Sequence, residues 1–115
     1  MKNIFLLLLL VSISSCKSSK LQTVEDAVII IQKTPCEGMC PEYEMMIFKD
    51  RTVKIEAKQH LPIKGNFISK LSESKYKELI SMFEKSNFFE LEDEYTSNIT
   101  DMPTTYLTYR NDTQA

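Results

Sequence analysis

An uncharged apolar run directly ahead of a cysteine divides this chain into a short leader and one small folding unit. Lys2 supplies the positive charge of a signal peptide, residues 4–13 form its apolar region, and Ser14 and Ser15 are the small residues that a signal peptidase requires. The run is too short to span a bilayer. Removal of residues 1–15 leaves residues 16–115, which is enough for one domain with a small core.

The residues Ile13-Ser14-Ser15-Cys16 resemble the lipobox of bacterial lipoproteins. This resemblance implies that Cys16 receives a diacylglycerol, becomes the acylated (palmitate-bearing) N-terminus, and starts a tether over residues 16–26. Two or three acyl chains, at about 0.8 kcal/mol for each buried methylene, make such an anchor effectively permanent. Lys17 in place of Asp favours the outer membrane by the usual sorting rule, so we expect an outer-membrane lipoprotein facing the periplasm. An ordinary secretory leader is the alternative, and it also exports the protein.

The charges of the remaining chain are balanced and interspersed, with 13 Lys or Arg (14 minus Lys2) against 16 Asp or Glu. Such a distribution offers no basic patch for nucleic acid. The two glycines, Gly38 and Gly65, are too few for the glycine-rich loops that hold phosphates. We therefore expect neither a nucleic-acid nor a nucleotide partner.

The spacing of apolar residues predicts an α+β domain over residues 27–115, with a small antiparallel sheet of about four strands packed on one main helix. Residues 27–31 are a β-branched run, residues 43–48 and 53–58 alternate as a hairpin around a tight connection at 49–51, and residues 104–109 are rich in β-forming side chains. Residues 66–68 are predicted to add only a short extended piece. Asn111-Asp112 is typical of the start of a turn, yet no strand follows, so we expect the chain to lack C-terminal elements.

The helix is the clearest element of the sequence. Its apolar side chains recur at helical spacing at Tyr76, Leu79, Ile80 and Phe83. Ser72 is the predicted N-cap, Glu73 and Lys77 are a predicted ion pair four residues apart, and Asn87 is the predicted left-handed C-cap.

Cys36 and Cys40 are the only two thiols left after acylation of Cys16. An oxidising envelope favours a disulfide between them, and a turn that Gly38 permits and Pro41 helps to fix would bring their Cα atoms into range. Closing so short a loop is worth about 2 kcal/mol in the chain-entropy model. A redox-active pair is the alternative, although the charges of Glu37 and Glu42 oppose thiolate formation.

Other chemically capable residues give weaker indications. Zinc normally needs four ligands, and beyond the two thiols the chain offers only His60 and carboxylates, so we expect no metal and no cofactor. His60 and the acidic run at residues 90–94 are typical of solvated surface, and Asp101, two residues before Pro103, is typical of a backbone-capping turn. With no serine in a nucleophile motif, we assign no catalytic residue.

Several short motifs resemble a bacterial domain family of unknown function that is carried mostly by small envelope lipoproteins. They are Thr34-Pro35-Cys36-x-Gly38-x-Cys40-Pro41-x-Tyr43, Ser86-Asn87-Phe88-Phe89, Asp93-x-Tyr95 and Thr100-Asp101-x-Pro103, within residues 27–110. The resemblance implies motif roles for Gly38, Pro41, Tyr43, Asp101 and Pro103, and a further strand and helix after the present end. The chain departs from the family at Arg51 and Ala57, where glycine is common. The resemblance implies a fold and no reaction.

These observations predict a non-enzymatic, lipid-tethered module that binds an envelope protein or component. In this hypothesis the helix covers one sheet face, and the other face or an edge meets the partner. A thiol-dependent redox protein or envelope enzyme using Cys36 and Cys40 is the alternative of a different class. A third hypothesis, a small-ligand binder, uses the aromatic residues around Tyr43, Phe67 and Tyr95, although aromatic residues at these spacings are more often core.

Overall fold

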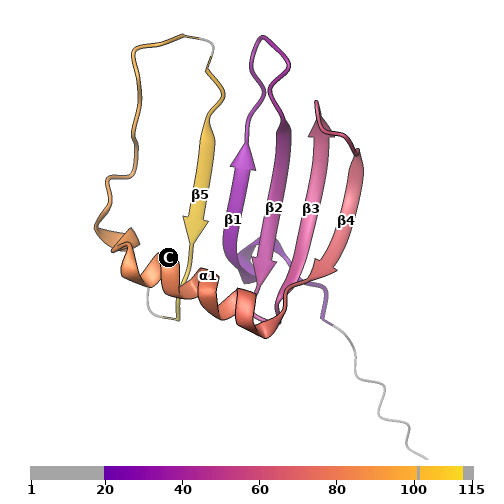
Figure 1. The fold of residues 1–115 in the computed structure, drawn as a ribbon, viewed down its shortest axis with the longest axis vertical. Coiled ribbons are helices and arrows are strands. Elements are labelled where there is room, and N and C mark those ends of the chain that lie inside the picture. The colour runs from indigo at the N-terminus through magenta and orange to yellow at the C-terminus, as the bar shows by residue number, and fades with distance from the viewer. Residues whose placement is uncertain (1–19, 101, 113–115) are drawn as a thin grey trace, which may run out of the picture.

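The computed structural model describes residues 20–100 and 102–112, so the leader, Cys16 and Asp101 lie outside the described residues. Five strands form one antiparallel sheet in the order β4-β3-β2-β1-β5 (Figure 1). The elements in chain order are η1 (Val24–Asp26), β1 (Ala27–Lys33), β2 (Glu42–Phe48), β3 (Thr52–Gln59), β4 (Gly65–Lys70), α1 (Glu73–Lys85), η2 (Phe88–Glu90) and β5 (Thr105–Tyr109). The α+β class is confirmed, and the predicted count of about four strands is wrong by one.

The additional strand is β4, for which the sequence predicted only a short extended piece. It pairs with β3 along its whole length, from Lys70 opposite Thr52 to Gly65 opposite Ala57. All six of its residues are exposed. Because neither face of this edge strand is buried, its residues need not alternate between apolar and polar. Its sequence therefore gives only a weak strand pattern. The C-terminal strand β5 pairs with β1 at the opposite edge of the sheet.

The N-cap of α1 is Ser72, as predicted, whereas its C-cap is Ser86 and not the predicted Asn87. The Lys75 backbone N–H donates to Ser72 Oγ at 3.2 Å, and Glu73 and Lys77 form an ion pair at 2.6 Å. Asn87, the residue directly after this C-cap, has the predicted left-handed conformation, with φ 51° and ψ 45°. These local signals are therefore sufficient to place both ends of the helix.

The connection between β2 and β3 is tight, as predicted. The Arg51 N–H donates to the Phe48 carbonyl at 2.8 Å, and the Thr52 N–H donates to Asp50 Oδ1 at 2.9 Å. Arg51 itself has a φ of 72°, in the left-handed region that favours glycine. Arginine thus occupies a backbone conformation that glycine adopts without strain.

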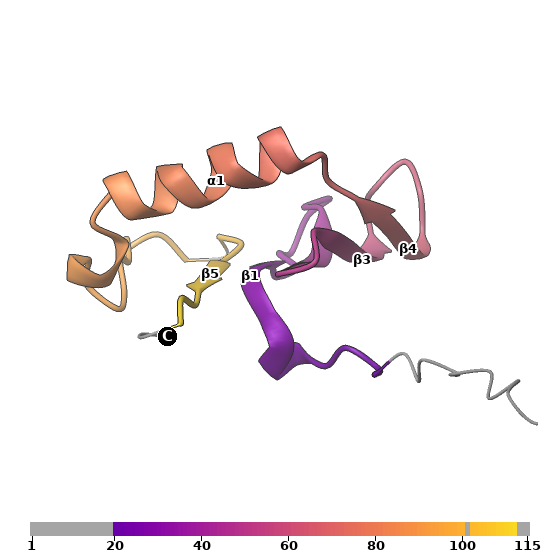
Figure 2. The ribbon, with the colours of Figure 1, turned by 90° about the horizontal axis from the view of Figure 1, so that it is seen from below.

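The helix covers one end of one sheet face, and the start of the described chain lies on the other face (Figures 1 and 2). Under the helix, four side chains that lie side by side across the strands are almost fully buried, and we call them the covered row: Tyr109, Ile29, Ile47 and Val53. The apolar side of α1 packs against this row. No helix within the described ranges is both long and apolar enough to cross a membrane.

The opposite face holds the N-terminal segment through polar contacts. Lys54 Nζ donates to the Gln22 carbonyl at 3.1 Å and lies 4.8 Å from the centre of the Phe48 ring. The Arg110 guanidinium donates to the carbonyls of Val24 and Ala27, each at 3.0 Å. These contacts fix η1 and the entry into β1 against the sheet.

Candidate functional site

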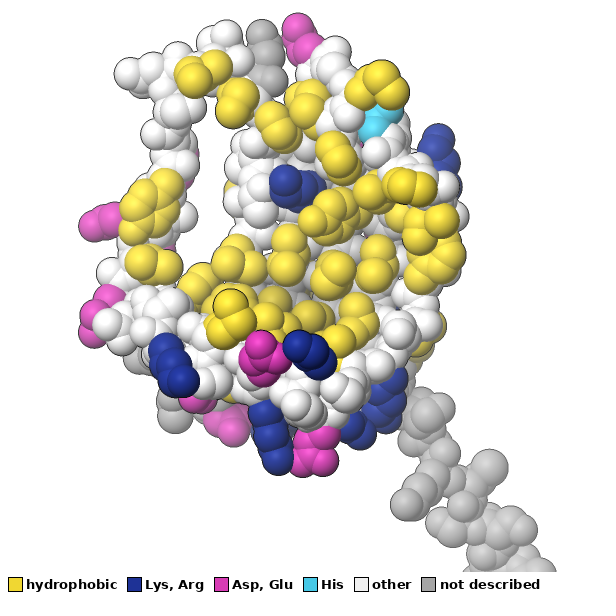
Figure 3. All heavy atoms as spheres, in the orientation of Figure 1, with side chains coloured by type: hydrophobic (Ala, Val, Ile, Leu, Met, Phe, Trp, Pro, Cys, Tyr) yellow, Lys and Arg dark blue, Asp and Glu magenta, His cyan; other side chains and the backbone are white. Residues whose placement is uncertain are grey.

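A second row of apolar side chains crosses the sheet beside the covered row, on the same face as α1. The strand register places Ile31 opposite both Leu107 and Met45, Met45 opposite Ile55, and Ile55 opposite Phe67. We call these five residues the open row. Leu107 is 45% exposed and Phe67 38% exposed at the two edges, and the three central side chains are half-buried. Figure 3 shows hydrophobic side chains gathered over this part of the sheet, above the helix.

The next row along the strands is mixed in character. Lys33 pairs with Tyr43 and with Thr105, and Tyr43 pairs with Ala57. The motif residue Tyr43 is half-buried and therefore borders the open row on its polar side. Lys33 and Tyr43 supply polar groups at the rim of an otherwise apolar surface.

The aromatic residues of the small-ligand hypothesis do not come together. Tyr43 and Phe67 share one face of the sheet, but Tyr95 lies in the segment between η2 and β5, at the opposite edge of the sheet from β4 (Figure 1). Tyr95 is 73% exposed, and its hydroxyl accepts a hydrogen bond from the Glu92 N–H at 3.1 Å. Sequence spacing gave no indication of this separation, because the order of the strands decides it.

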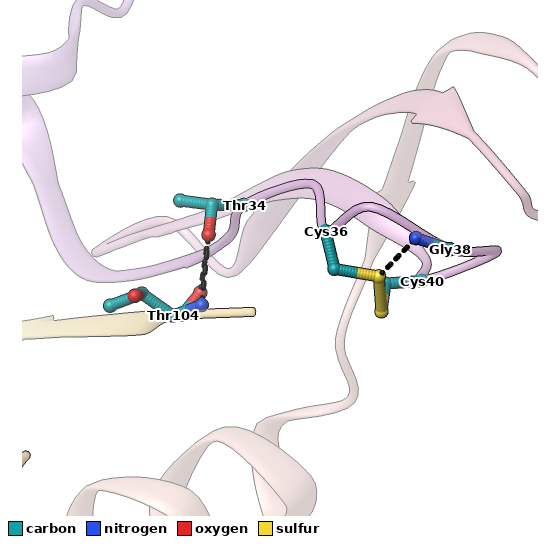
Figure 4. Close-up of a disulfide and its surroundings, with 5 residues drawn as sticks. All are labelled: Thr34, Cys36, Gly38, Cys40 and Thr104. Atoms are coloured by element: carbon teal, nitrogen blue, oxygen red, sulfur yellow. Dashed lines mark hydrogen bonds between the residues drawn. A yellow bond between two sulfur atoms is a disulfide. The ribbon is translucent and has the colours of Figure 1, made fainter. Parts of the chain in front are cut away.

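The predicted disulfide between Cys36 and Cys40 is present at the tip of the β1–β2 hairpin (Figure 4). The two Cα atoms are 5.7 Å apart, and the Gly38 N–H donates to Cys36 Sγ at 3.3 Å. Below the tip, Thr34 and Thr104 are joined by hydrogen bonds that include one from the Thr104 N–H to Thr34 Oγ1 at 2.8 Å. The bridge and these bonds hold the ends of β1, β2 and β5 together at the end of the sheet away from α1.

Gly38 does not use the freedom for which the sequence analysis singled it out. Gly65 is the glycine with a positive φ, and a Cβ added at Gly38 would lie 3.7 Å from Cys36 Sγ, which is ordinary contact. The turn is therefore closed by the disulfide without a left-handed glycine. This part of the sequence-based explanation is wrong.

The remaining predicted residues lie apart from the open row. Pro41 is exposed just before β2, Pro103 is half-buried before β5, and His60 is exposed with a φ of 55°. The acidic residues from Glu90 to Glu94 are exposed. In the part of the chain that the structure describes, no three His, Cys, Asp or Glu side chains are grouped so that they could hold a metal ion.

Two features beside the N-terminal segment were not predicted from the sequence: a side-chain cap and a cavity. Asp26 Oδ2 accepts hydrogen bonds from the Thr23 N–H at 2.9 Å and from the Thr23 hydroxyl at 3.0 Å, and these bonds hold the pKa of Asp26 below its ordinary value. The Thr-x-x-Asp spacing was the available signal. A cavity of about 330 Å³ lies beside this turn, between the N-terminal segment and the β2–β3 connection, and its lining includes Leu21, Phe48 and Lys49.

An aromatic cluster at the other end of α1 was only partly foreseen. Phe83 stacks on Tyr109 with ring centroids 4.6 Å apart, and Phe88 and Phe89 pack around the same tyrosine. Burial, followed by the negative charge of Glu84, raises the pKa of Tyr109. Within this cluster Phe88 is half-buried, whereas Phe89 remains 38% exposed.

Comparison with known proteins identifies the domain. Neither the curated proteins nor the solved structures include a significant match to this chain. The model of a domain family of unknown function, DUF6438, matches residues 27–115. Its first matched residue is Ala27, the first residue of β1. Because the match covers most of the sequence, the chain belongs to the DUF6438 domain family.

Proposed function

We propose that this chain is a lipid-anchored, non-enzymatic binding module of the bacterial envelope, with the open row as its protein-binding surface. The observation that carries the proposal is a continuous apolar row across all five strands that α1 leaves partly exposed. At a strand spacing of about 4.8 Å, the row is roughly 19 Å long. Contiguous apolar surface bordered by polar groups is typical of protein interaction sites.

The arrangement of the two faces supports this proposal. Residues 20–26 lie on the face opposite the open row (Figure 2). A tether that continues from Lys20 towards an acylated Cys16 would therefore leave the domain on the face away from the partner. An outer-membrane anchor and an unobstructed binding surface are compatible in this geometry.

A redox function of the disulfide is the competing proposal, and the exposed position of the hairpin tip favours it. Met39, next to Cys40, is 84% exposed, so a partner could reach the bridge. A reduction potential near that of periplasmic oxidants would support this proposal, whereas a value below about −300 mV marks a structural bridge. We expect the lower value.

Site-specific photocrosslinking in intact cells tests the binding surface. A photoreactive amino acid replaces Phe67 or Leu107 in the open row, and the matched controls carry it at Ile68 or Tyr106 on the opposite face. We expect the same discrete protein adduct from positions 67 and 107, with little from positions 68 and 106. Equal crosslinking on both faces, or no adduct from the open row, would contradict the proposal.

The anchor is tested separately. Cells that are fed an alkyne-tagged palmitate should label the wild-type chain and leave the Cys16→Ser variant unlabelled. The wild-type chain should fractionate with outer membranes. Recovery of an unlabelled, soluble wild-type chain would contradict the anchor and leave the crosslinking result to be judged independently.

A further inference from the structure

A shallow cavity of about 370 Å³ lies where the C-terminal end of α1 meets η2 and the second residue after β5. Its lining consists of Phe83, Glu84, Asn87, Phe88, Phe89, Glu90 and Asn111. Three phenylalanine and two glutamate residues thus line one small space. The open row does not contribute to it, so the cavity is independent of the proposed function.

The three phenylalanine rings, which we call the aromatic wall, pack against the buried ring of Tyr109. The rings of Phe83, Phe88 and Phe89 have centroids 4.6, 5.9 and 5.5 Å from that of Tyr109, which is 2% exposed. Phe88 also meets Phe83 at 5.3 Å and Phe89 at 5.9 Å, both edge to face. Because each ring is fixed by its neighbours, the wall is preorganised and a ligand does not have to order it.

The charge around the cavity is negative and largely uncompensated. Among the described residues, neither Glu84 nor Glu90 forms an ion pair. Lys85 is the one cation within residues 83–90 and is exposed, and Glu92, Asp93 and Glu94 follow directly. The C-terminal end of α1 adds the negative end of its dipole. Each of these features favours a cation over a neutral or anionic ligand.

From this combination we propose that the cavity binds an organic cation, an alkylammonium or a guanidinium group, between the phenylalanine rings and the carboxylates of Glu84 and Glu90. Aromatic faces attract such cations through their quadrupoles, and the negative charges of the two carboxylates add to the attraction. Quaternary ammonium and guanidinium groups lose little hydration when they enter a site of this kind, which favours them over inorganic cations.

Aromatic-region NMR of the purified full chain in maltoside micelles provides the direct test. Choline is the first probe, and 3,3-dimethylbutan-1-ol, its neutral isostere of the same shape, is the control ligand. We expect choline to shift the ring signals of Phe89 with a dissociation constant on the order of 1 mM and the isostere to bind at least about tenfold more weakly. Equal binding of the two would overturn the proposal, because shape alone would then explain it.

Charge-neutralising variants distinguish binding in this cavity from non-specific attraction of a cation to the nearby acidic residues. Glu84→Gln and Glu90→Gln should each weaken choline binding roughly threefold, and together about tenfold. Glu94→Gln removes the same charge from the neighbouring acidic segment, outside the cavity lining, and should weaken binding much less than either of these variants. All three variants keep the side-chain size, so folding is preserved. An equal loss in Glu94→Gln would overturn the proposal.

A second pair of probes identifies the source of the cation. The capped tripeptide Gly-Arg-Gly presents a guanidinium as a polypeptide does, and Gly-norleucine-Gly is its uncharged control. Tighter binding of the arginine peptide than of choline assigns the site to a basic side chain of a protein, and the reverse order assigns it to a free small amine. Absence of binding by both cations refutes the site.

Discussion

Arg51 occupies a left-handed backbone conformation, with a φ of 72°, in the connection from β2 to β3. In this region the Cβ atom of a residue lies too close to the carbonyl oxygen that follows it, which costs about 1 kcal/mol. Glycine has no Cβ atom and avoids this cost. The Arg51 carbonyl accepts a hydrogen bond from the Leu71 N–H at 2.9 Å, which glycine would preserve. We therefore expect Arg51→Gly to raise the free energy of unfolding by about 0.5–1 kcal/mol, measured by urea denaturation.

Arg51→Ala is the control for this substitution. Alanine removes the arginine side chain and keeps the Cβ atom that causes the crowding, so it should give no comparable gain. If alanine stabilised the chain as much as glycine, the arginine side chain and not the backbone conformation would be responsible.

Ionisation of the buried Tyr109 should lower the stability of the folded chain at alkaline pH. Burial, and secondly the charge of Glu84, raises its pKa, so the folded state holds the phenolic proton more tightly than the unfolded chain does. This contribution is fully present below about pH 10 and is lost as the pH rises through the higher folded value. We expect the thermal midpoint of Tyr109→Phe to fall less steeply than that of the wild-type chain above about pH 10.

The matched control is Tyr106→Phe, on the same strand but 56% exposed. Its midpoint should follow the wild-type curve at every pH. Parallel curves for wild type and Tyr109→Phe would show that Tyr109 ionisation is not coupled to folding.

The elements that are determined by residues close together in the chain could be predicted from the sequence. Ser72, the Glu73–Lys77 pair and Asn87 define α1 through contacts within one or two turns, and the alternation in β2 and β3 defines their hairpin. The full length of β4 and the position of β5 beside β1 depend on long-range pairing. No local pattern encodes that pairing, because exposed edge strands are free of the constraint that burial places on sequence.

The hairpin tip is the element whose stability the disulfide should change. Replacement of Cys36 and Cys40 by serine should lower the free energy of unfolding by about 2 kcal/mol, because the unfolded chain regains the freedom of the short loop. Reductant should destabilise the wild-type chain by a similar amount and leave the double variant unchanged, as urea denaturation would show. A loss well above this value would indicate that the bridge supports the core and not only the tip.

At the scale of the whole molecule, one helix is too narrow for the sheet that it covers. A helix is about 10 Å across, whereas a strand of seven residues extends roughly 23 Å. Side chains on one face repeat about every 7 Å along a strand, so α1 buries the covered row and leaves the open row beside it. From the sequence alone, the partner is expected on the other face or at an edge. The open row, which we propose as the binding surface, lies on the same face as the helix, because strand periodicity contains no information on the width of the helix.

Because the two rows differ in burial, substitution by threonine should have different effects on stability in the open row and in the covered row. Phe67→Thr with Leu107→Thr alters two side chains that are 38% and 45% exposed, and threonine keeps the preference for strand. We expect unfolding free energy to change by less than about 1 kcal/mol, while fluorescence of the apolar dye anilinonaphthalene sulfonate bound to the chain falls by about half. Ile29→Thr in the covered row buries a hydroxyl at a site that is 1% exposed, and should cost about 2–4 kcal/mol.

The control for the dye measurement is Ile68→Thr with Tyr106→Thr, the neighbouring residues on the opposite face of the same two strands. Both are more exposed than their open-row neighbours, at 75% and 56%, yet they face polar residues such as Lys54 and Gln32 across the strands. Dye binding should therefore fall much less in this variant, since the dye needs contiguous apolar surface and not merely exposed apolar atoms. An equal fall in both double variants would show that the open row is not a distinct surface, and would remove the physical basis for a binding role.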